Sequence, residues 1–346
     1  MRQGARQLRT NFAAASLTRF GGIYLVHSFF QRLCLRAFPM RKIDYPQRNN
    51  HYTLSEMPLA LMYPMILGLE KIEVSALLKT NGVFGCITGL PTFPDPQTFR
   101  RFLVRAAPEL LPQLRSAHDQ LRARFLCLPT TPSSFWIDCD STACALCGKQ
   151  EGAVKGCNPN HRGGKSCHPL IVTEGHRGDC LAGLLRHGNA HAAEGADALI
   201  ERARCLLPHR RDLRLRADSG FYDGSLVRKV REQMEFAIVA KMTAPVKAAA
   251  QGKSYQRISR KFSTSAFSCK PHGWAGEERF VILRRRLPPE ELEEQTLFTL
   301  DAHAHSVIAT NLPLTPYNVF QFCGDRMGME RIIRMLKDDY PFGAAP

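Results

Sequence analysis

Two strand-like runs of this chain end in aspartate, and they constrain its fold more than any other feature. The first run, Phe135 to Asp140, has an apolar residue at every second position, and the second, Leu213 to Asp218, does the same. Successive side chains of a strand point to opposite faces, so each run predicts a strand with one apolar face. Each predicted strand also brings an aspartate to its carboxyl end, where the chain leaves the sheet.

The residues around these runs predict an α/β core. From Ser134 onward the expected order is strand, strand, strand, helix, strand, helix and then a further strand. The elements expected after the first strand are Pro169 to Thr173, Cys180 to Arg186, His191 to Leu206, Leu213 to Asp218, a helix capped by Asp223 that ends near Glu235, and Phe236 to Lys241. This order matches a ribonuclease-H-like core, a mixed sheet flanked by helices.

The expected organisation has four segments. They are a helical N-terminal domain at 1–130, the first part of the core at 131–242, an inserted β-containing subdomain at 243–302, and the last core strand with a final helix at 303–346. In the first segment, Thr53 to Glu56 has capping-box form, and Asp95 offers an N-cap before a proline. The insertion contains a predicted strand, Arg279 to Arg286, followed by the acidic stretch Glu290 to Glu294.

The final helix carries a third acidic motif. Its charged residues Arg326, Glu330, Arg334 and Lys337 are spaced i, i+4, i+8 and i+11, which places them on one helical face. The apolar residues Met329, Ile333 and Leu336 supply another face. The alternative is a surface helix with ordinary ion pairs between neighbouring turns.

The three acidic motifs together predict a metal site. Asp140 is preferred as a ligand because it stands at the strand end before two small hydroxyl residues, and Asp138 is expected behind it, supporting the ligands without binding the metal. Asp218 and Glu330 complete the expected set, although Asp218 taken alone is better explained as a cap at a strand-to-turn junction. Oxygen-rich sites of this kind suit Mg²⁺ or Mn²⁺ and phosphodiester chemistry.

The charge balance indicates a polyanionic partner. The formal net charge is +16, from 47 Lys and Arg against 31 Asp and Glu. Charge alone does not separate DNA from RNA or from an anionic membrane. Three arginines on the helix after Asp95, namely Arg100, Arg101 and Arg105, are candidates to contact DNA phosphates, and the alternative is a solvated basic helix.

The motifs together resemble a known family, the transposase DDE domain group 1 of bacterial insertion sequences, of the kind called insertion sequence family 1380-like. The resemblance covers nearly the whole chain. It rests on Asp138-x-Asp140-Ser141-Thr142, Gln150-Glu151-Gly152-Ala153-x-Lys155-Gly156, Ser166-x-His168-Pro169-Leu170, Gly183-x4-Gly188-Asn189, Arg216-Ala217-Asp218-Ser219-Gly220-Phe221, and Arg326-x3-Glu330-x6-Lys337.

The resemblance implies a mechanism. Asp140, Asp218 and Glu330 would hold two Mg²⁺ (or Mn²⁺) ions, while Arg326 and Lys337 grip phosphate beside them. The outcome would be cleavage at terminal inverted repeats and strand transfer into target DNA by a homodimer bound to double-stranded DNA. Further expected DNA contacts are Arg334 on the final helix and Lys155 and Lys165 of a polar, basic loop.

Departures from the family pattern leave alternatives open. Cys323 stands where the signature has tyrosine, Cys157 and Cys167 stand where relatives have aromatic residues, and the chain ends at residue 346, sooner after Glu330 than is usual. A second hypothesis is therefore a truncated, inactive relic that binds terminal repeats without cutting them. A third is a metal nuclease without strand transfer.

Two further motifs are disfavoured. Cys144-x2-Cys147 has zinc-ligand spacing, but the next pair, Cys157 and Cys167, is too widely separated for a zinc knuckle, even with His161 and His168 nearby. The stretch Pro159 to Ser166 resembles a phosphate loop without its first glycine, so nucleotide hydrolysis is rejected. Trp274 in the insertion is interpreted as a packing residue rather than a base-stacking one.

The sequence predicts neither a membrane span nor a signal peptide. The longest apolar stretch, Met57 to Leu69, is short for a span and contains Pro58 and Pro64. We therefore expect a cytoplasmic, nucleoid-associated protein whose 12 cysteines are reduced thiols.

Overall fold

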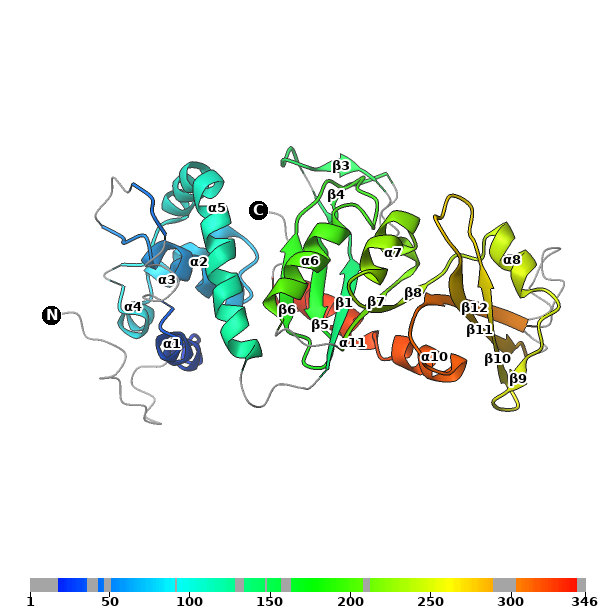
Figure 1. The fold of residues 1–346 in the computed structure, drawn as a ribbon. Coiled ribbons are helices and arrows are strands. Elements are labelled where there is room, and N and C mark those ends of the chain that lie inside the picture. Colours follow the sequence, from blue (N-terminus) through cyan, green and yellow to red (C-terminus); the bar gives the residue numbers. More distant parts are fainter. Residues whose placement is uncertain are drawn as a thin grey trace. The chain divides into compact units, whose positions relative to one another are not determined.

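The structure is a computed structural model that describes residues 18–35, 43–46, 51–90, 92–127, 134–146, 148–156, 163–207, 212–288 and 303–340. The chain divides into two compact units, which Figure 1 shows as ribbons. The first comprises Met1–Leu126 with the segments Cys144–Cys147 and Arg334–Pro346. The second comprises Cys127–Ala143 and Gly148–Ile333.

Helices make up the N-terminal part of the first unit, where it is described. They are α1 Ile23–Arg32, α2 Glu56–Ile66, the 3-10 turn η4 Ile72–Ser75, α3 Ala76–Lys79, α4 Gly82–Thr88 and α5 Pro96–Leu126. Edge-to-face aromatic contacts fill the core between them, with ring centroids of Tyr63 and Phe84 5.6 Å apart and those of Phe84 and Phe93 5.3 Å apart.

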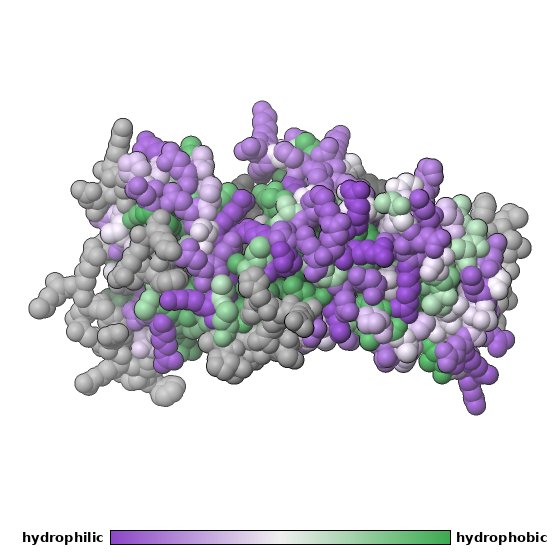
Figure 2. All heavy atoms as spheres, in the orientation of Figure 1, coloured by the Kyte–Doolittle hydropathy of each residue, from purple (hydrophilic) through white to green (hydrophobic). Residues whose placement is uncertain are grey.

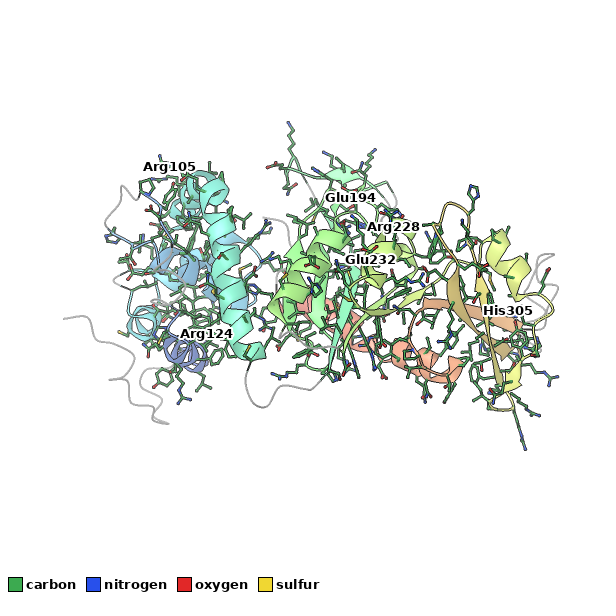
Figure 3. All side chains as sticks on the ribbon, in the orientation of Figure 1. Arg105, Arg124, Glu194, Arg228, Glu232 and His305 are labelled. Carbon is green, nitrogen blue, oxygen red and sulfur yellow. The ribbon has the colours of Figure 1, made fainter. Side chains whose placement is uncertain are left out.

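Helix starts in this unit follow the sequence signals. The Glu56 carboxylate accepts a 2.8 Å hydrogen bond from the Thr53 backbone N–H, which is the reciprocal half of a capping box. Helix α5 begins at Pro96, directly after Asp95, whose carbonyl accepts from the Thr98 N–H at 2.9 Å. Figure 3 shows Arg105 near one end of α5 and Arg124 near the other.

A nine-stranded mixed sheet forms the centre of the second unit. Its strands are β1 Phe135–Ser141, β5 Leu170–Glu174, β6 Cys180–Leu184, β7 Leu213–Ala217, β8 Glu235–Val239, β9 Gln256–Arg257, β10 Phe262–Cys269, β11 Glu278–Arg286 and β12 His303–Thr310. Their order across the sheet is β6-β5-β1-β7-β8-β12-β11-β10-β9.

The first five strands of that order have the topology predicted from the sequence. β1, β5 and β6 form an antiparallel meander, whereas β7 pairs with β1 in parallel and β8 pairs with β7 in parallel. This order and these directions are those of a ribonuclease-H-like core, so the predicted fold class is confirmed.

The predicted insertion at 243–302 extends the same sheet. It supplies α8 Ala244–Ala250 and the strands β9, β10 and β11, and β11 pairs antiparallel with β12 along eight residue pairs from Arg279↔Thr310 to Arg286↔His303. β12 in turn pairs with β8 of the core. The acidic stretch Glu290 to Glu294 lies outside the described residues.

Helices cover both faces of the sheet. They are α6 Ala196–Leu206, α7 Gly224–Arg231, α8, α10 Pro316–Gly324 and α11 Met327–Asp338, with a 3-10 turn η5 at Ser219–Phe221. Figure 1 shows α6 and α7 in front of the core strands and α11 behind them, and Figure 2 shows mainly hydrophilic residues along the front. On the rear face, Val319 and Phe322 of α10 are buried with Val281 and Ile308 of the sheet.

The predicted polar loop around Lys155 and Lys165 contains two short antiparallel strands, β3 Val154–Lys155 and β4 Lys165–Cys167. The short strand β2 Cys144–Ala145 precedes them in the chain. Two motif glycines explain how closely the backbones approach. A Cβ on Gly156 would lie 1.8 Å from the Gly188 carbonyl oxygen, and a Cβ on Gly188 would lie 2.1 Å from that of Ser166.

Element boundaries differ from the prediction where side chains compete with the helix. Helix α6 starts at Ala196 rather than at His191. The buried guanidinium of Arg186 donates from Nη1 to the carbonyl oxygens of His191, Ala192 and Glu194 at 2.8 to 2.9 Å. These bonds hold the segment in turns, because its carbonyls are taken up by a side chain instead of by helical N–H groups.

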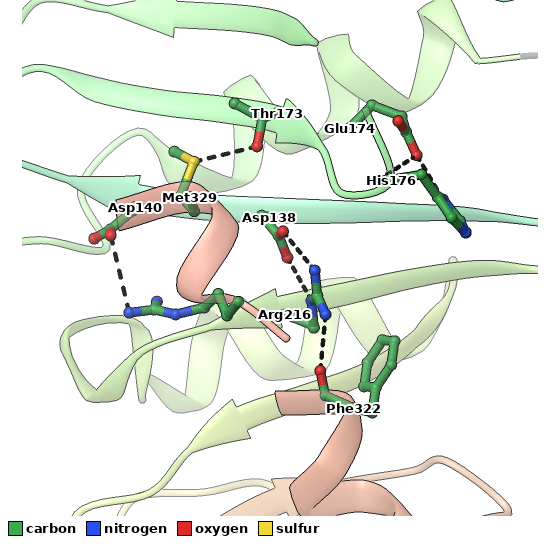
Figure 4. Close-up of polar contacts among 9 residues, drawn as sticks. Asp138, Asp140, Thr173, Glu174, His176, Arg216, Phe322 and Met329 are labelled. Carbon is green, nitrogen blue, oxygen red and sulfur yellow. Dashed lines mark hydrogen bonds and ion pairs between the residues drawn. The ribbon is translucent and has the colours of Figure 1, made fainter. Parts of the chain in front are cut away.

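One buried ion pair joins the central strands. Asp138 on β1 and Arg216 on β7 stand opposite each other in register, and both carboxylate oxygens accept from the guanidinium at 2.6 Å (Figure 4). Their side chains are 3% and 1% exposed. Nη1 of Arg216 also donates to the Phe322 carbonyl of α10 at 2.8 Å, so the pair ties two strands to the rear helix.

Aromatic rings and a glycine close the space around this pair. The guanidinium carbon of Arg216 lies 5.1 Å from the centroid of Trp136 and 5.0 Å from that of Phe322. A Cβ on Gly175 would stand 2.9 Å from Nη2 of Arg216 and 3.0 Å from Oδ2 of Asp138. The position therefore accepts no larger residue without moving the ion pair.

We expect Arg216→Met to destabilise the second unit by about 3–5 kcal/mol, because it leaves Asp138 charged and buried without its partner. The double variant Asp138→Leu/Arg216→Met removes both charges and should recover most of that loss. Denaturant midpoints of the two variants measure the difference. Equal destabilisation by the single and the double variant would contradict this account.

Candidate carboxylate site

Two aspartates stand side by side at the carboxyl ends of β1 and β7. The strands are parallel, and Cys139 of β1 is in register with Ala217 of β7. Asp140 follows Cys139, and Asp218 follows Ala217. The register therefore brings both aspartates to the same strand-end edge, on the face that also carries Asp138 and Arg216.

Backbone N–H groups hold both carboxylates. Oδ1 of Asp140 accepts from the Ser141 N–H at 2.8 Å, and Oδ1 of Asp218 accepts from the Gly220 N–H at 2.9 Å. Asp218 thus does cap the short η5 turn, as its alternative interpretation expected, and this cap also orients the carboxylate. Asp140 is 8% exposed, whereas Asp218 is half-buried.

Helix α11 brings in the third acidic residue. Met329, 1% exposed, anchors the helix because its sulfur accepts a 3.2 Å hydrogen bond from the Thr173 hydroxyl of β5 (Figure 4). Glu330 follows it and is exposed, one turn after Arg326. Ile333 is also buried, so the expected apolar side of the helix faces the sheet.

The electrostatics of Asp140 reflect its burial and the two other carboxylates. Burial raises the pKa of Asp140 to about 6 against the opposing effect of Arg326, and the negative charges of Asp218 and Glu330 raise it further. Ionising Asp140 at neutral pH therefore costs free energy that a nearby cation would recover.

Arg326 is the nearby cation in this structure. Its Nη2 lies 3.8 Å from Oδ2 of Asp140, with the arginine side chain 15% exposed and that of the aspartate 11% exposed (Figure 4). Its Nη1 is buried and makes no hydrogen bond within the described residues. A buried guanidinium nitrogen without an acceptor is costly, and an incoming anion would satisfy it.

The donor set fits a hard divalent cation in chemistry. Asp140, Asp218 and Glu330 offer only carboxylate oxygens, the ligands preferred by Mg²⁺ and Mn²⁺. Among the described residues, no three acidic, histidine or cysteine side chains stand close enough to hold a metal ion as arranged here. Asp138 is not a further ligand candidate, because Arg216 occupies both of its carboxylate oxygens.

The expected DNA contacts fall in several places. In the first unit, Arg101 and Arg105 are exposed on α5, while Arg100 forms an ion pair with Glu73. In the second, Lys155 and Lys165 are exposed and directly opposite each other on β3 and β4.

Only part of the final charged motif is placed at the carboxylates. Arg334 and Lys337 follow Glu330 on later turns of α11, and these turns belong to the first unit. Arg326 and Glu330 belong to the second unit, with Asp140 and Asp218.

Two important arginines carried no predicted role. Arg216 lies two residues before Asp218 and Asp138 lies two residues before Asp140, so each shares a strand face with its aspartate. The strand pattern could therefore have predicted the pairing of Asp138 with Arg216. Arg186 gave no such signal, because its carbonyl acceptors lie in an irregular loop.

The cysteines show no zinc site where they are described. Cys144 and Cys167 are buried, and Cys147, Cys157 and His161 lie outside the described residues. Cys323, at the tyrosine position of the signature, is largely enclosed, and this burial raises its pKa to about 12. Its thiol is therefore protonated at neutral pH.

Trp274 is a packing residue, as interpreted from the sequence. Its ring centroid lies 4.9 Å from that of Tyr222, and a Cβ on Gly224 would stand 2.8 Å from its indole. Among the described residues, no helix combines the length and apolar character needed to cross a membrane.

Comparisons with known proteins bear on the family. No curated protein matches the sequence. A cryo-electron microscopy structure of the piggyBac transposase synaptic complex with hairpin DNA is similar at 9% identity and a TM-score of 0.43, covering 96% of this chain and 63% of that one. The chain thus spans less than two thirds of the length of that solved chain. The family model described as transposase DDE domain group 1 matches residues 2–343, so the chain belongs to this family, as its motifs indicated.

Proposed function

We propose that this chain is a metal-dependent DNA transposase with Asp140, Asp218 and Glu330 as its catalytic residues. The observation that carries the proposal is the register of β1 and β7, which brings Asp140 and Asp218 to one strand-end edge, where burial and the charges of Asp218 and Glu330 raise the pKa of Asp140 to about 6. Strongly perturbed carboxyl groups gathered at a strand-end edge are typical of functional sites. Membership of the DDE transposase family supports the same function.

The three carboxylates would hold two Mg²⁺ or Mn²⁺ ions. Bound there, the ions would activate the attacking oxygen and stabilise the leaving oxygen at a DNA phosphodiester. The chain's own contribution is to position the ligands: Ser141 and Gly220 fix one oxygen of each aspartate through their N–H groups. The packing of Met329 on Thr173 fixes the helix that presents Glu330.

Arg326 would take a substrate phosphate. It already lies beside Asp140, and its buried Nη1 lacks an acceptor within the described residues. With a divalent cation held by Asp140, the guanidinium of Arg326 would be able to turn its donors to a phosphate oxygen, where charge-assisted hydrogen bonds are strongest.

The substrate would be double-stranded DNA. Terminal inverted repeats would be cut and joined to target DNA, and a homodimer would hold the paired ends. Lys337, Arg334, Lys155 and Lys165 would contribute phosphate contacts, as would the α5 arginines Arg100, Arg101 and Arg105. A cytoplasmic, nucleoid-associated location follows from this substrate.

A second candidate function is DNA binding without cleavage. It is favoured by the spacing of the acidic side chains, which, among the described residues, form no group close enough for a metal ion. A nuclease that cuts without strand transfer is the third. Products separate all three, because joined strands, cut strands and intact but bound DNA are distinct on a sequencing gel.

We expect Asp140→Asn, Asp218→Asn and Glu330→Gln each to lower Mg²⁺-dependent cleavage of DNA carrying the terminal repeats by at least about 100-fold. Outer-shell partners of metal ligands already cost about 10–100-fold, and a ligand should cost more. Binding to the same DNA should persist or tighten, since each change removes negative charge. Cleavage and gel-shift assays measure the two effects.

The matched control is Glu232→Gln at the end of α7, which is exposed (Figure 3). It removes the same charge from the same unit and should leave cleavage unchanged. Cleavage that survives in the three site variants would refute the catalytic assignment, and binding without cleavage by the parent chain would leave the second candidate standing.

Asp140→Asn should stabilise the metal-free protein at neutral pH. The folded-state pKa of about 6 lies above the ordinary value of 3.8, so the folded state binds the proton more tightly than the unfolded state. Stability therefore falls as pH rises from about 4 to 6, and the full penalty, at most about 3 kcal/mol, applies above that range. Melting temperatures of variant and parent should differ at pH 7.5 and converge near pH 4. A gap that stays constant between the two pH values would contradict the assigned cause.

Arg326→Gln should separate metal binding from turnover. Loss of the guanidinium removes the cation beside Asp140, so Mn²⁺ should bind the carboxylates more tightly at pH 8, whereas cleavage should fall because the phosphate contact is lost. Calorimetric titration with Mn²⁺ and the cleavage assay measure the two. Weaker Mn²⁺ binding in the variant would show that Arg326 supports the ligands instead of competing for them.

A further inference from the structure

Basic side chains form two rows across the outer strands of the sheet. In the first row, Arg257 of β9 faces Ser263 of β10, Ser263 faces Arg284 of β11, and Arg284 faces His305 of β12. In the second, Arg286 faces His303 and its N–H bonds to the Lys261 carbonyl. The basic sheet face is defined here as Arg257, Lys261, Arg284, Arg286, His303 and His305.

All six lie on one face because directly opposed residues share a face and side chains repeat every second residue. The same face carries Phe280 and Ile282 nearer the middle of β11, and both are fully buried. The opposite face carries Val281 and Ile308 against α10. The basic sheet face is thus the continuation of an apolar face, and it turns cationic only toward the strand ends.

Among the described residues, few carboxylates lie along this stretch of positive charge, and the acidic stretch Glu290 to Glu294 lies outside them. Between residues 251 and 288 the acidic residues are Glu277 and Glu278, and Glu278 pairs with Arg231. Within the described part of the chain, Arg257, Lys261, Arg284 and Arg286 have no carboxylate partner. Figure 2 shows hydrophilic residues protruding at the end of the unit where Figure 1 places β9.

Arg284 is held in place before any ligand arrives. Its Nε donates to the Ser263 hydroxyl at 3.0 Å, and its guanidinium carbon lies 4.0 Å from the centroid of the Tyr255 ring. A planar guanidinium fixed in this way loses little freedom on binding, and its other N–H donors are suited to a bidentate contact with phosphate.

Protection of a sheet edge does not explain this arrangement. Charged residues on edge strands block aggregation, but Arg284 lies inside the sheet, paired with Ser263 of β10 on one side and with His305 of β12 on the other. Basic residues directly opposite each other on neighbouring strands are unfavourable without a counter-charge. An anionic partner would offset that cost.

We propose that the basic sheet face binds the phosphate backbone of duplex DNA, as a second contact surface apart from the carboxylates. Asp140 and Asp218 lie on the face covered by α10, so the two surfaces point away from each other. The first row crosses three strand intervals, about 14 Å, and duplex DNA carries a charge about every 1.7 Å of its axis. That length suits a polymer better than a small anion. The choice of DNA rests on the proposed function.

The test is the salt dependence of binding to a fluorescent duplex of unrelated sequence, measured by anisotropy in EDTA with the full chain. Arg257→Gln/Lys261→Gln/Arg286→Gln changes three exposed residues. Each lost phosphate contact should lower the slope of log affinity against log salt by about 0.9, so the triple variant should lose nearly three times that amount. Circular dichroism melting confirms that the variant is folded.

The matched control is Arg228→Gln/Lys247→Gln/Lys270→Gln, which removes the same charge from exposed residues of the same unit outside the rows (Figure 3 shows Arg228). A salt-dependence slope that falls in the variant of the basic sheet face and stays unchanged in the control supports the proposal. Equal changes in both, or none in either, overturn it, as does a row-dependent affinity for anionic lipid vesicles with an unchanged DNA slope.

The outcome is independent of cleavage because the carboxylates are intact and no metal is present. A chain that fails to cut DNA yet shows the row-dependent slope loses the proposed function and keeps this surface. A chain that cuts DNA with an unchanged slope loses only this surface.

Discussion

The buried pair between Asp138 and Arg216 is the interaction on which the rest of the second unit depends. It crosses the parallel β1–β7 junction, where the two candidate catalytic aspartates emerge two residues later, and it reaches α10 through the Phe322 carbonyl. Any slip in register between β1 and β7 would separate two charges in a nearly dry interior, at a cost of several kcal/mol. The pair therefore fixes the positions of Asp140 and Asp218 relative to each other along the strand direction. A site built from two strands depends on this relative position.

Two neighbouring aspartates on β1 thus have opposite electrostatic situations. Both carboxylate oxygens of Asp138 accept from Arg216, whereas Asp140 is buried, accepts from the Ser141 N–H, and lies 3.8 Å from the cationic Arg326. The ion pair of Asp138 stabilises the fold. The ionisation of buried Asp140 costs free energy that its contacts within the described part of the fold do not fully offset. A cost retained at a strand end, beside an arginine with an unsatisfied buried nitrogen, is typical of a site completed by a cation and a phosphate.

Most of this core was accessible from the sequence because its signals are local. Strand alternation located β1 and β7, and parallel register then placed Asp140 beside Asp218. The misses have physical causes. Arg186 turns residues 191–194 away from a helix through side-chain bonds to carbonyls, and the Ser-rich β10 shows little apolar contrast along its length. The position of β11 in the sheet could not be predicted either. The sequence from Arg279 to Arg286 predicts a strand, but its local pattern does not indicate that this strand pairs with β12 and extends the core sheet.

That lengthening matters for the partner as much as for the fold. Each strand of a sheet is rotated by about 20–25° relative to its neighbour. Each strand added beyond β8 therefore increases the angle between the local sheet surface and the sheet surface at the carboxylates. A small substrate would meet only one of the two surfaces. A long polyanion could contact Arg284 and Arg286 only with a segment other than the one at the carboxylates, because the two surfaces lie on opposite faces of the sheet. The basic sheet face belongs to an extension of the core sheet and not to a separate domain. Its orientation relative to the carboxylate site is therefore fixed, because the strands between the two are hydrogen-bonded to one another.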